Sequence, residues 1–206
     1  MRIGIDFDNT IVSYDALFHR VALERNLIPA NRPPTKLGVR DHLRQTGREE
    51  AWTDLQGYVY GARMDEAVAY PGAIDFFGWA HAAGMSLSIV SHKTRHPFLG
   101  HPYDLHEAAR GWVRKFLTEQ PQPLILETNV YFELTKEDKL SRIAALDLDC
   151  FIDDLPEILL AAAFPQRTAG LLFDPDGMLP REARIPAFRS WRQLRHHVES
   201  RWTRQR

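Results

Sequence analysis

The sequence has little cysteine, little excess charge and no long hydrophobic run. Its single cysteine, Cys150, excludes an internal disulfide and a four-cysteine zinc site, and it suits a reducing cytosol. With 26 Lys and Arg residues against 27 Asp and Glu residues, the net charge of -1 gives no electrostatic reason to expect a nucleic-acid partner. The longest stretch without Asp, Glu, Lys or Arg, residues 76–92, contains glycine and histidine and is too short and too polar to cross a membrane.

The amino-terminal segment also lacks the pattern of a secretory signal, because Asp6 and Asp8 fall where an apolar stretch would lie. What is present is a chain of 206 residues with 44% hydrophobic and 26% charged residues, the composition of a globular protein. We therefore expect a cytoplasmic protein with one domain, or one domain that carries an insertion, and no membrane contact. The sequence gives no indication of its oligomeric state.

Five short apolar segments each end in a polar residue, which is typical of strands in a parallel sheet covered on both faces. These segments are residues 2–7, 85–90, 130–132, 150–152 and 170–173. Amphipathic patterns predict helices over residues 72–83, 104–117, 135–146, 156–164 and 190–198. The alternation of strands and helices predicts an α/β fold with a Rossmann-like parallel sheet and right-handed crossovers.

The stretch between the first two strands interrupts this alternation. It predicts helices around residues 14–26, 39–44 and 49–60 instead of a pair of strands. We interpret residues 13–70 as a small helical cap inserted into a core made of residues 1–12 and 71–206. Aromatic and arginine side chains of the cap either pack one cap helix on another or contact a substrate. They are Trp52, Tyr58, Tyr60, Arg40, Arg44 and Arg63.

Two pairs of aspartates follow two of the predicted strands. Asp6 and Asp8 follow the first strand, and Asp153 and Asp154 follow the fourth. Carboxylates this close to one another repel unless a cation or hydrogen bonds hold them. Because the carboxyl ends of neighbouring parallel strands share one crevice, the four acids predict a site for Mg²⁺, which binds carboxylates, water and phosphate oxygens. The alternative is that they only cap turns, which two pairs at equivalent strand ends disfavour.

Four short segments of the sequence carry a family resemblance. The segment Asp6-Phe7-Asp8-Asn9-Thr10 resembles the first motif of the haloacid dehalogenase (HAD) superfamily, Asp-x-Asp-x-Thr after a hydrophobic strand. Ser91 resembles the Ser or Thr of the second motif, Lys139 resembles the lysine of the third, and Asp153-Asp154 resembles the acidic fourth motif. All four occur in the order of the family, and the insertion after the first strand falls where the family places its helical cap.

The resemblance implies a Mg²⁺-dependent phosphohydrolase that cleaves a small phosphate ester through an aspartyl-phosphate intermediate. Asp6 would be the nucleophile, and Asp8 would be the general acid and then the general base. Asp6, the backbone carbonyl of Asp8 and an acid of the fourth motif would hold the Mg²⁺ ion. We favour Asp154 as the direct ligand and Asp153 as its support. The sequence leaves open which of the two binds the ion directly.

Three further residues complete the set that the resemblance implies. Ser91 and Lys139 would bind the phosphoryl oxygens, and Lys139 would also offset the repulsion between the phosphate and the acids. Thr10 would belong to the same phosphate-binding set by orienting its loop. Lys136, three residues before Lys139, is the rival for the role of the lysine.

Shorter segments resemble the 5'(3')-deoxyribonucleotidases of this superfamily. They are residues 70–73, 102–104, 112–116 and 152–156. The cap sequence has no comparable match, so nucleotide monophosphates and sugar phosphates remain equally open as substrates. A phosphate-binding module without catalysis and a phosphotransferase or mutase also remain open. A phosphonatase-type lyase is disfavoured because the cap has no assured lysine for a Schiff base, Lys36 being the only lysine there.

A basic loop follows Ser91 at the proposed crevice. Lys93 and Arg95 in this loop are candidates for further substrate contacts, and the alternative is a solvated connection. The histidines of the loop and His106 do not repeat a known pattern of zinc ligands, so zinc binding is disfavoured. The histidines of the loop are His92, His96 and His101.

Overall fold

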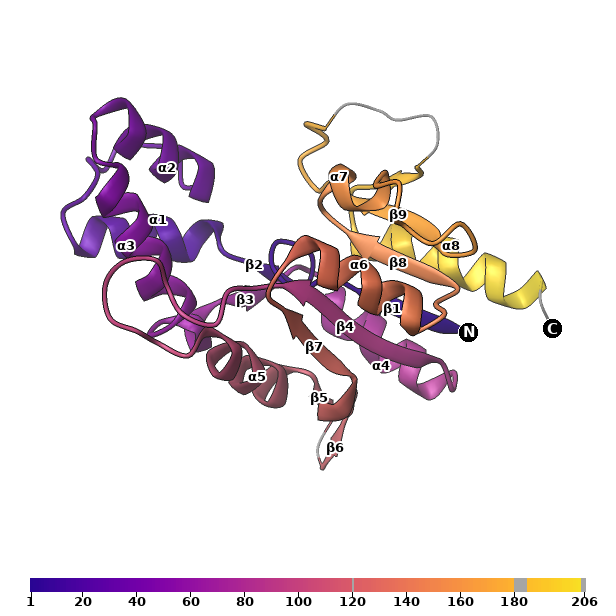
Figure 1. Ribbon diagram of the computed structural model, residues 1–206. Helices are drawn as coiled ribbons and strands as arrows, with labels where there is room; N and C mark the ends of the chain where they lie inside the picture. Colours follow the sequence, from indigo (N-terminus) through magenta and orange to yellow (C-terminus); the bar gives the residue numbers. More distant parts are fainter. Residues whose placement is uncertain (120, 180–184, 205–206) are drawn as a thin grey trace.

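Six parallel strands form the central sheet, and the strand that precedes the first acidic pair lies inside it (Figure 1). The computed structural model describes residues 1–119, 121–179 and 185–204. Within them the strand order is β10-β9-β8-β1-β4-β7. The strands are β1 (Arg2–Ile5), β4 (Ser86–His92), β7 (Val130–Glu133), β8 (Cys150–Asp153), β9 (Ala169–Phe173) and β10 (Ala187–Phe188). The predicted parallel α/β sheet is therefore confirmed.

Helices cover both faces of this sheet, as its continuously apolar strands predict. They are α4 (Ala73–Ala82), α5 (Leu105–Phe116), α6 (Lys136–Ala145), α7 (Pro156–Leu159) and α8 (Trp191–Arg204). Neighbouring residues of β4 alternate between the two faces: Ile89 packs in the core with residues of α4, α5 and α8, and Val90 packs in the core with residues of α6 and α7. In β8, Ile152 packs in the same core as Ile89, and Phe151 packs in the same core as Val90.

Three helices after β1 form the cap, which lies to the left of the sheet in Figure 1. They are α1 (Asp15–Glu24), α2 (Lys36–Gln45) and α3 (Glu49–Tyr60). A short antiparallel pair, β2 (Val12–Ser13) with β3 (Val68–Ala69), lies where the chain leaves the core and where it returns. Trp52 of α3 stacks on Phe18 of α1 with ring centroids 5.2 Å apart, and both side chains are buried. Trp52 thus packs cap helix on cap helix.

Side-chain oxygens satisfy the first backbone N–H groups of three helices. Thr35 accepts a hydrogen bond from the N–H of Gly38 at 3.0 Å at the start of α2. Asp104 and Thr135 do the same for α5 and α6, at 2.9 and 3.0 Å from the N–H groups three residues later. These N-caps set where each helix begins. Among the helices of the described residues, none combines the length and the apolar character that a membrane crossing requires.

Several boundaries differ from the sequence prediction. The helix predicted over residues 156–164 ends at Leu159. Leu160 forms the C-cap of this helix, and residues 162–164 continue as turn and bend. The last helix continues past residue 198 to Arg204, and the first strand ends at Ile5.

Short elements were not predicted, because two or three residues carry no periodic pattern. They are β2, β3, β10, a second antiparallel pair β5 (Thr118–Glu119) and β6 (Gln122–Pro123), and the 3₁₀ turns Met64–Glu66 and Glu127–Asn129.

Gly4 lets β1 pack closely against the layer that contains α6 and α7. A Cβ at this position would lie 2.4 Å from Leu148 Cδ1 and 2.6 Å from Phe151 Cδ2. We therefore expect Gly4→Ala to lower the free energy of unfolding by about 1–3 kcal/mol through overpacking, measured by urea denaturation. Gly78→Ala is the matched control, because Gly78 lies within α4 and a Cβ there meets nothing within 4 Å. This control is expected to raise the free energy of unfolding by about 0.5–1 kcal/mol, and a harmless Gly4→Ala would contradict the packing argument.

Candidate active site

The two acidic pairs meet at the carboxyl ends of β1 and β8. Ile5 of β1 pairs with Ile152 of β8, and the N–H of Asp6 donates to the carbonyl of Ile152 at 2.8 Å. This register places Asp6 beside the pair Asp153 and Asp154. One carboxylate oxygen from each of these three residues lies within 4.8 Å of the others. The parallel register therefore brings together acids from positions 6 and 153–154 of the sequence.

Lys139 of α6 lies between the two acidic pairs. Its Nζ donates to Asp6 Oδ1 at 2.7 Å and to Asp153 Oδ2 at 2.6 Å, and its side chain is 2% exposed. Burial alone would lower the pKa of this ammonium group, but the charges of Asp6 and Asp153 outweigh burial and hold the pKa above its usual value. Lys136, the rival lysine, pairs instead with Glu157 at 2.7 Å and is half exposed. The ammonium group of Lys139 is therefore the one in the acidic cluster.

The two acids of the fourth motif have different hydrogen-bond partners. Both carboxylate oxygens of Asp153 are engaged, one by Lys139 and the other by the N–H of Leu155 at 2.9 Å. Asp154 accepts a hydrogen bond from the hydroxyl of Thr10 at 3.3 Å on Oδ1. Asp154 thus has more coordination capacity left for a cation than Asp153. Thr10 is buried, and its hydroxyl reaches Asp154.

Burial makes the carboxylates of this cluster costly to ionise. It raises the pKa of Asp153 to about 7, against the opposing charge of Lys139, and it raises the pKa of Asp154 well above 3.8, with further repulsion from Asp6 and Asp153. A divalent cation relieves this cost, and carboxylate oxygens are the ligands that Mg²⁺ prefers. The donor chemistry of Asp6, Asp153 and Asp154 therefore fits a hard cation.

Asp8 is held by two donors that come from different parts of the chain. Tyr14 OH donates to Asp8 Oδ1 at 2.5 Å, and Lys93 Nζ donates to Asp8 Oδ2 at 2.7 Å. Asn9 turns the chain directly after Asp8 with a φ of +59°, a left-handed conformation that Asn tolerates better than most residues. Burial, followed by the charge of Asp8, raises the pKa of Tyr14 well above 10.0, so its hydroxyl stays protonated as a donor.

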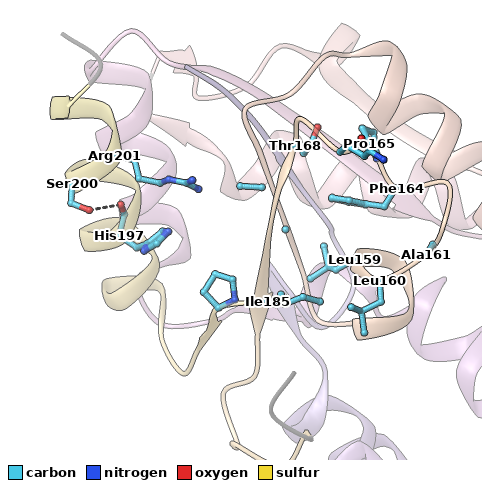
Figure 2. A pocket seen from close by; sticks show the side chains of 14 residues that line it. Leu159, Leu160, Ala161, Phe164, Pro165, Thr168, Ile185, His197, Ser200 and Arg201 are labelled. Carbon is cyan, nitrogen blue, oxygen red and sulfur yellow. Dashed lines mark hydrogen bonds between the residues drawn. The ribbon is translucent and has the colours of Figure 1, made fainter. Parts of the chain in front are cut away.

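A small cavity of about 80 Å³ connects these groups. Its lining includes both acids of the first motif, Ser91 from the end of β4, Lys139 and Asp154. Ser91 is buried, and it lies where the sequence predicts a contact with a phosphoryl group. A larger cavity of about 770 Å³ lies between the α7–β9 connection and α8 (Figure 2), and its described lining contains no acidic residue.

The two predicted substrate residues of the basic loop lie in different places. Lys93 is buried against Asp8, and its Nζ lies 4.8 Å from the ring centre of Tyr60 in the cap. Arg95 is largely exposed and pairs with Asp104 at the start of α5, at 3.1 Å. Of the two, only Lys93 shares a contact with the acidic motifs in the described part of the chain.

The loop histidines and the cap arginines have other partners. His92, His96 and His106 each contact a backbone carbonyl, and His101 stacks on Tyr103. The only group of three or more potential metal ligands in residues 1–119, 121–179 and 185–204 is the aspartate cluster. Ion pairs within the cap occupy its arginines: Arg40 with Asp41, Arg44 with Glu49, and Arg63 with Glu24 and Glu66.

Three residues of the site were not predicted as members of it: Asn9, Tyr14 and Lys36. Lys36 Nζ, from the cap, lies 3.3 Å from Asn9 Oδ1. The sequence offers no signal for these contacts. Tyr14 begins the helix predicted around residues 14–26, and Lys36 precedes the helix predicted around residues 39–44.

No family model matches the sequence, and no curated protein matches it. Solved structures match over nearly the full chain. A haloacid dehalogenase-like hydrolase of Streptococcus pneumoniae has a TM-score of 0.59 and 14% identity, covering 96% of this chain and 97% of that one. A HAD family hydrolase of Deinococcus radiodurans, with bound phosphate and sodium, has a TM-score of 0.56 and 16% identity over 97% and 95%. The HAD-hydrolase YfnB of Bacillus subtilis, bound to magnesium, has a TM-score of 0.56 and 16% identity over 96% and 97%.

These similarities show that the chain has the HAD-like fold, with a helical cap after the first strand of a parallel core. At identities of 14–16% they are similarities of fold. The resemblance to deoxyribonucleotidases stays a prediction.

We expect MgCl₂ to raise the melting temperature more at about pH 8 than at about pH 5.5. The pKa of Asp153 is raised to about 7 and that of Asp154 is raised above 3.8, so the folded chain binds these protons more tightly than the unfolded chain. The stability that these protons contribute is fully present at a pH below the pKa of the carboxyl groups in the unfolded chain. It is lost as the pH rises through about 7, the raised pKa of Asp153 in the folded chain. A divalent cation compensates only ionised carboxylates, so its effect grows over the same interval. Thermal unfolding with and without MgCl₂ measures two quantities: the melting temperature without metal and its increase when MgCl₂ is added.

Asp154→Asn tests whether this response comes from the cluster. The variant is expected to lose most of the Mg²⁺ response and, without metal, to melt above the original chain at about pH 8 because a buried charge is gone. Asp75→Asn, at an exposed position of α4, is the matched control and is expected to change neither quantity. An equal Mg²⁺ response in the original chain and the Asp154 variant contradicts the proposed cation site.

Proposed function

We propose that this protein is a Mg²⁺-dependent phosphohydrolase that cleaves a small phosphomonoester through an aspartyl-phosphate on Asp6. The observation that carries the proposal is the placement of Lys139, 2.7 Å from Asp6 and 2.6 Å from Asp153 inside a cluster of three aspartates. The magnesium and the phosphate bound in two structures of the same fold add support.

Asp6, Asp154 and the backbone carbonyl of Asp8 would hold the ion, with Asp153 and Lys139 supporting them. When bound, Mg²⁺ supplies positive charge that orients a phosphate and offsets its repulsion from the carboxylates. The lysine and Ser91 contribute further stabilisation of the phosphoryl oxygens.

Asp6 attacks phosphorus through a carboxylate oxygen, the bond between phosphorus and the ester oxygen breaks, and that oxygen takes a proton from Asp8. Water then attacks phosphorus and gives a proton to Asp8, and the bond between phosphorus and Asp6 breaks to release inorganic phosphate. Asp8 must therefore carry a proton in the first step. A substrate phosphate that attracts Lys93 would leave Oδ2 of Asp8 free to carry that proton, while Tyr14 keeps the other oxygen in place.

The charged residues of the site bear on three alternatives: a lyase, a binding module without catalysis, and a phosphotransferase or mutase. A lyase with a Schiff base needs a neutral amine, whereas the pKa of Lys36 is raised: burial lowers it, and interactions with Tyr60 and the carboxylates of Asp8 and Asp154 outweigh burial. A binding module without catalysis has no need of the pair Asp6 and Asp8, each with its own positively charged partner. A phosphotransferase or mutase would use the same groups and differs in the acceptor, so release of inorganic phosphate separates it from a hydrolase.

We expect Asp6→Asn to reduce hydrolysis of p-nitrophenyl phosphate in the presence of Mg²⁺ roughly a thousandfold or more, because the nucleophile is lost. Release of p-nitrophenol and of inorganic phosphate measures the change. Asp75→Asn is the matched control, and a single cooperative thermal transition of both variants excludes misfolding. Activity that survives Asp6→Asn removes Asp6 from the role of nucleophile.

We expect Tyr14→Phe to lower kcat roughly 10- to 100-fold with little change in KM, which corresponds to the loss of a hydrogen bond to a charged group. The reason is that Asp8 loses the donor that fixes one of its oxygens, while the phosphate contacts remain. Steady-state kinetics on p-nitrophenyl phosphate measures kcat and KM separately. Tyr131→Phe removes a hydroxyl from β7 as the matched control, and an unchanged kcat in the Tyr14 variant would show that Asp8 needs no such support.

A further inference from the structure

Lys36 is the positively charged residue of the cap that reaches the core site. It is the first residue of α2, and its backbone N–H donates to Asp15 Oδ1 at 2.8 Å, which ties the start of α2 to the start of α1. Its side chain extends to Asn9, whose Oδ1 lies 3.3 Å from Nζ. Asn9 lines the cavity that contains Asp6 and Asp8. Lys36 therefore contacts, from the side of the cap, a residue that lines this cavity.

Aromatic rings surround the end of this side chain. Its Nζ lies 6.0 Å from the ring centre of Tyr14, 5.7 Å from that of Phe18 and 5.6 Å from that of Tyr60. The rings pack on one another, with centroids 4.9 Å apart for Tyr14 and Tyr60 and 5.5 Å apart for Phe18 and Tyr60. Such rings attract a cation weakly but do not neutralise it. The ammonium group is thus held in place without direct contact to a carboxylate, and Asp8 and Asp154 act on it only from a greater distance.

The three lysines around the site differ in how far their charge is compensated. Lys139 contacts two carboxylates, and Lys93 contacts one. For Lys36, no carboxylate of residues 1–119, 121–179 and 185–204 lies within 4.0 Å of Nζ, and the amide oxygen of Asn9 is its polar contact at the core. A positive group that lies one residue behind the lining of the cavity and lacks such a partner is suited to bind an anion of the ligand.

The transferred phosphoryl group does not need this lysine, because Lys139, Ser91 and the cation site already meet it beside Asp6. A role for Lys36 in recognition requires that the alcohol part of the ester extends from that point toward the cap, from which Lys36 reaches Asn9. We infer that Lys36 binds a second anionic group on the alcohol part, so that the preferred substrates are phosphate esters that also carry a carboxylate or a second phosphate. This inference rests on the proposed phosphohydrolase function and assigns Lys36 as its specificity-determining residue.

Matched esters test the inference. They are 3-phosphoglycerate against glycerol 3-phosphate, in which CH₂OH replaces the carboxylate, and fructose 1,6-bisphosphate against fructose 6-phosphate. We expect the original chain to hydrolyse at least one ester with a second anion with a kcat/KM roughly 10- to 100-fold above that of its partner. Lys36→Met is expected to remove this preference, because kcat/KM falls roughly 10- to 100-fold more for the ester with the second anion than for p-nitrophenyl phosphate, which has none. Lys36→Arg is expected to keep most of the preference.

Arg40→Met is the matched control, because Arg40 is a positive residue of the same helix that pairs with Asp41. An equal loss for all esters in Lys36→Met would show that Lys36 serves the transferred phosphoryl group and would overturn the inference, as would the absence of any preference in the original chain. If no ester, including p-nitrophenyl phosphate, is hydrolysed, the proposed function fails instead. In that case, calorimetry measures the binding of 3-phosphoglycerate and fructose 1,6-bisphosphate to the original chain and to Lys36→Met. Equal binding to both proteins, or no binding to either, overturns the inference about Lys36.

Discussion

The contact of Lys139 with Asp6 and Asp153 is the interaction on which the rest of the site depends. Buried carboxylates are stable only when positive charge and hydrogen bonds replace the water that they have lost. When all four carboxylates of the site are ionised, they outnumber the three ammonium groups, so the site has an excess of one negative charge before any cation or substrate binds. A divalent cation reverses the sign of this excess, and a phosphate dianion restores it. The charges of the site are thus arranged so that metal and phosphate each favour the binding of the other.

The sequence was sufficient to predict the parallel sheet because its strands are apolar on both sides. Ile89 and Val90 are adjacent, and each is buried in a different core, which only a sheet with helices on both faces allows. Strand ends were less well predicted, since nothing in residues 2–7 marks the point where pairing stops. The helix predicted over residues 156–164 ends at Leu159, and the apolar residues that follow it continue in a turn, so an apolar run alone does not mark where a helix ends.

The acidic half of the site was predictable, and its cap-side half was not. Asp6, Lys139, Asp153 and Asp154 each follow or precede a core strand, so the parallel order alone brings them to one edge of the sheet. Tyr14 and Lys36 reach the site because of how α1 and α2 pack, and no pattern in a single sequence gives the direction of a side chain across such an interface. Arg95 illustrates the same limit from the other side: it belongs to the basic loop, yet it pairs with Asp104 on the surface.

The loop Asp8-Asn9 joins the chemistry of the core to the cap. Asp8 receives its two hydrogen bonds from Tyr14, next to the first cap helix, and from Lys93, which in turn lies against Tyr60 of α3. Asn9 receives Lys36 from α2. A change in the position of the cap therefore changes the donors around the proton-transfer group and the distance of the free ammonium from the cavity at the same time. In this arrangement the group that would select a substrate and the group that would protonate it are both held by cap residues, and the β2–β3 pair where the chain leaves and re-enters the core begins only four residues after Asp8.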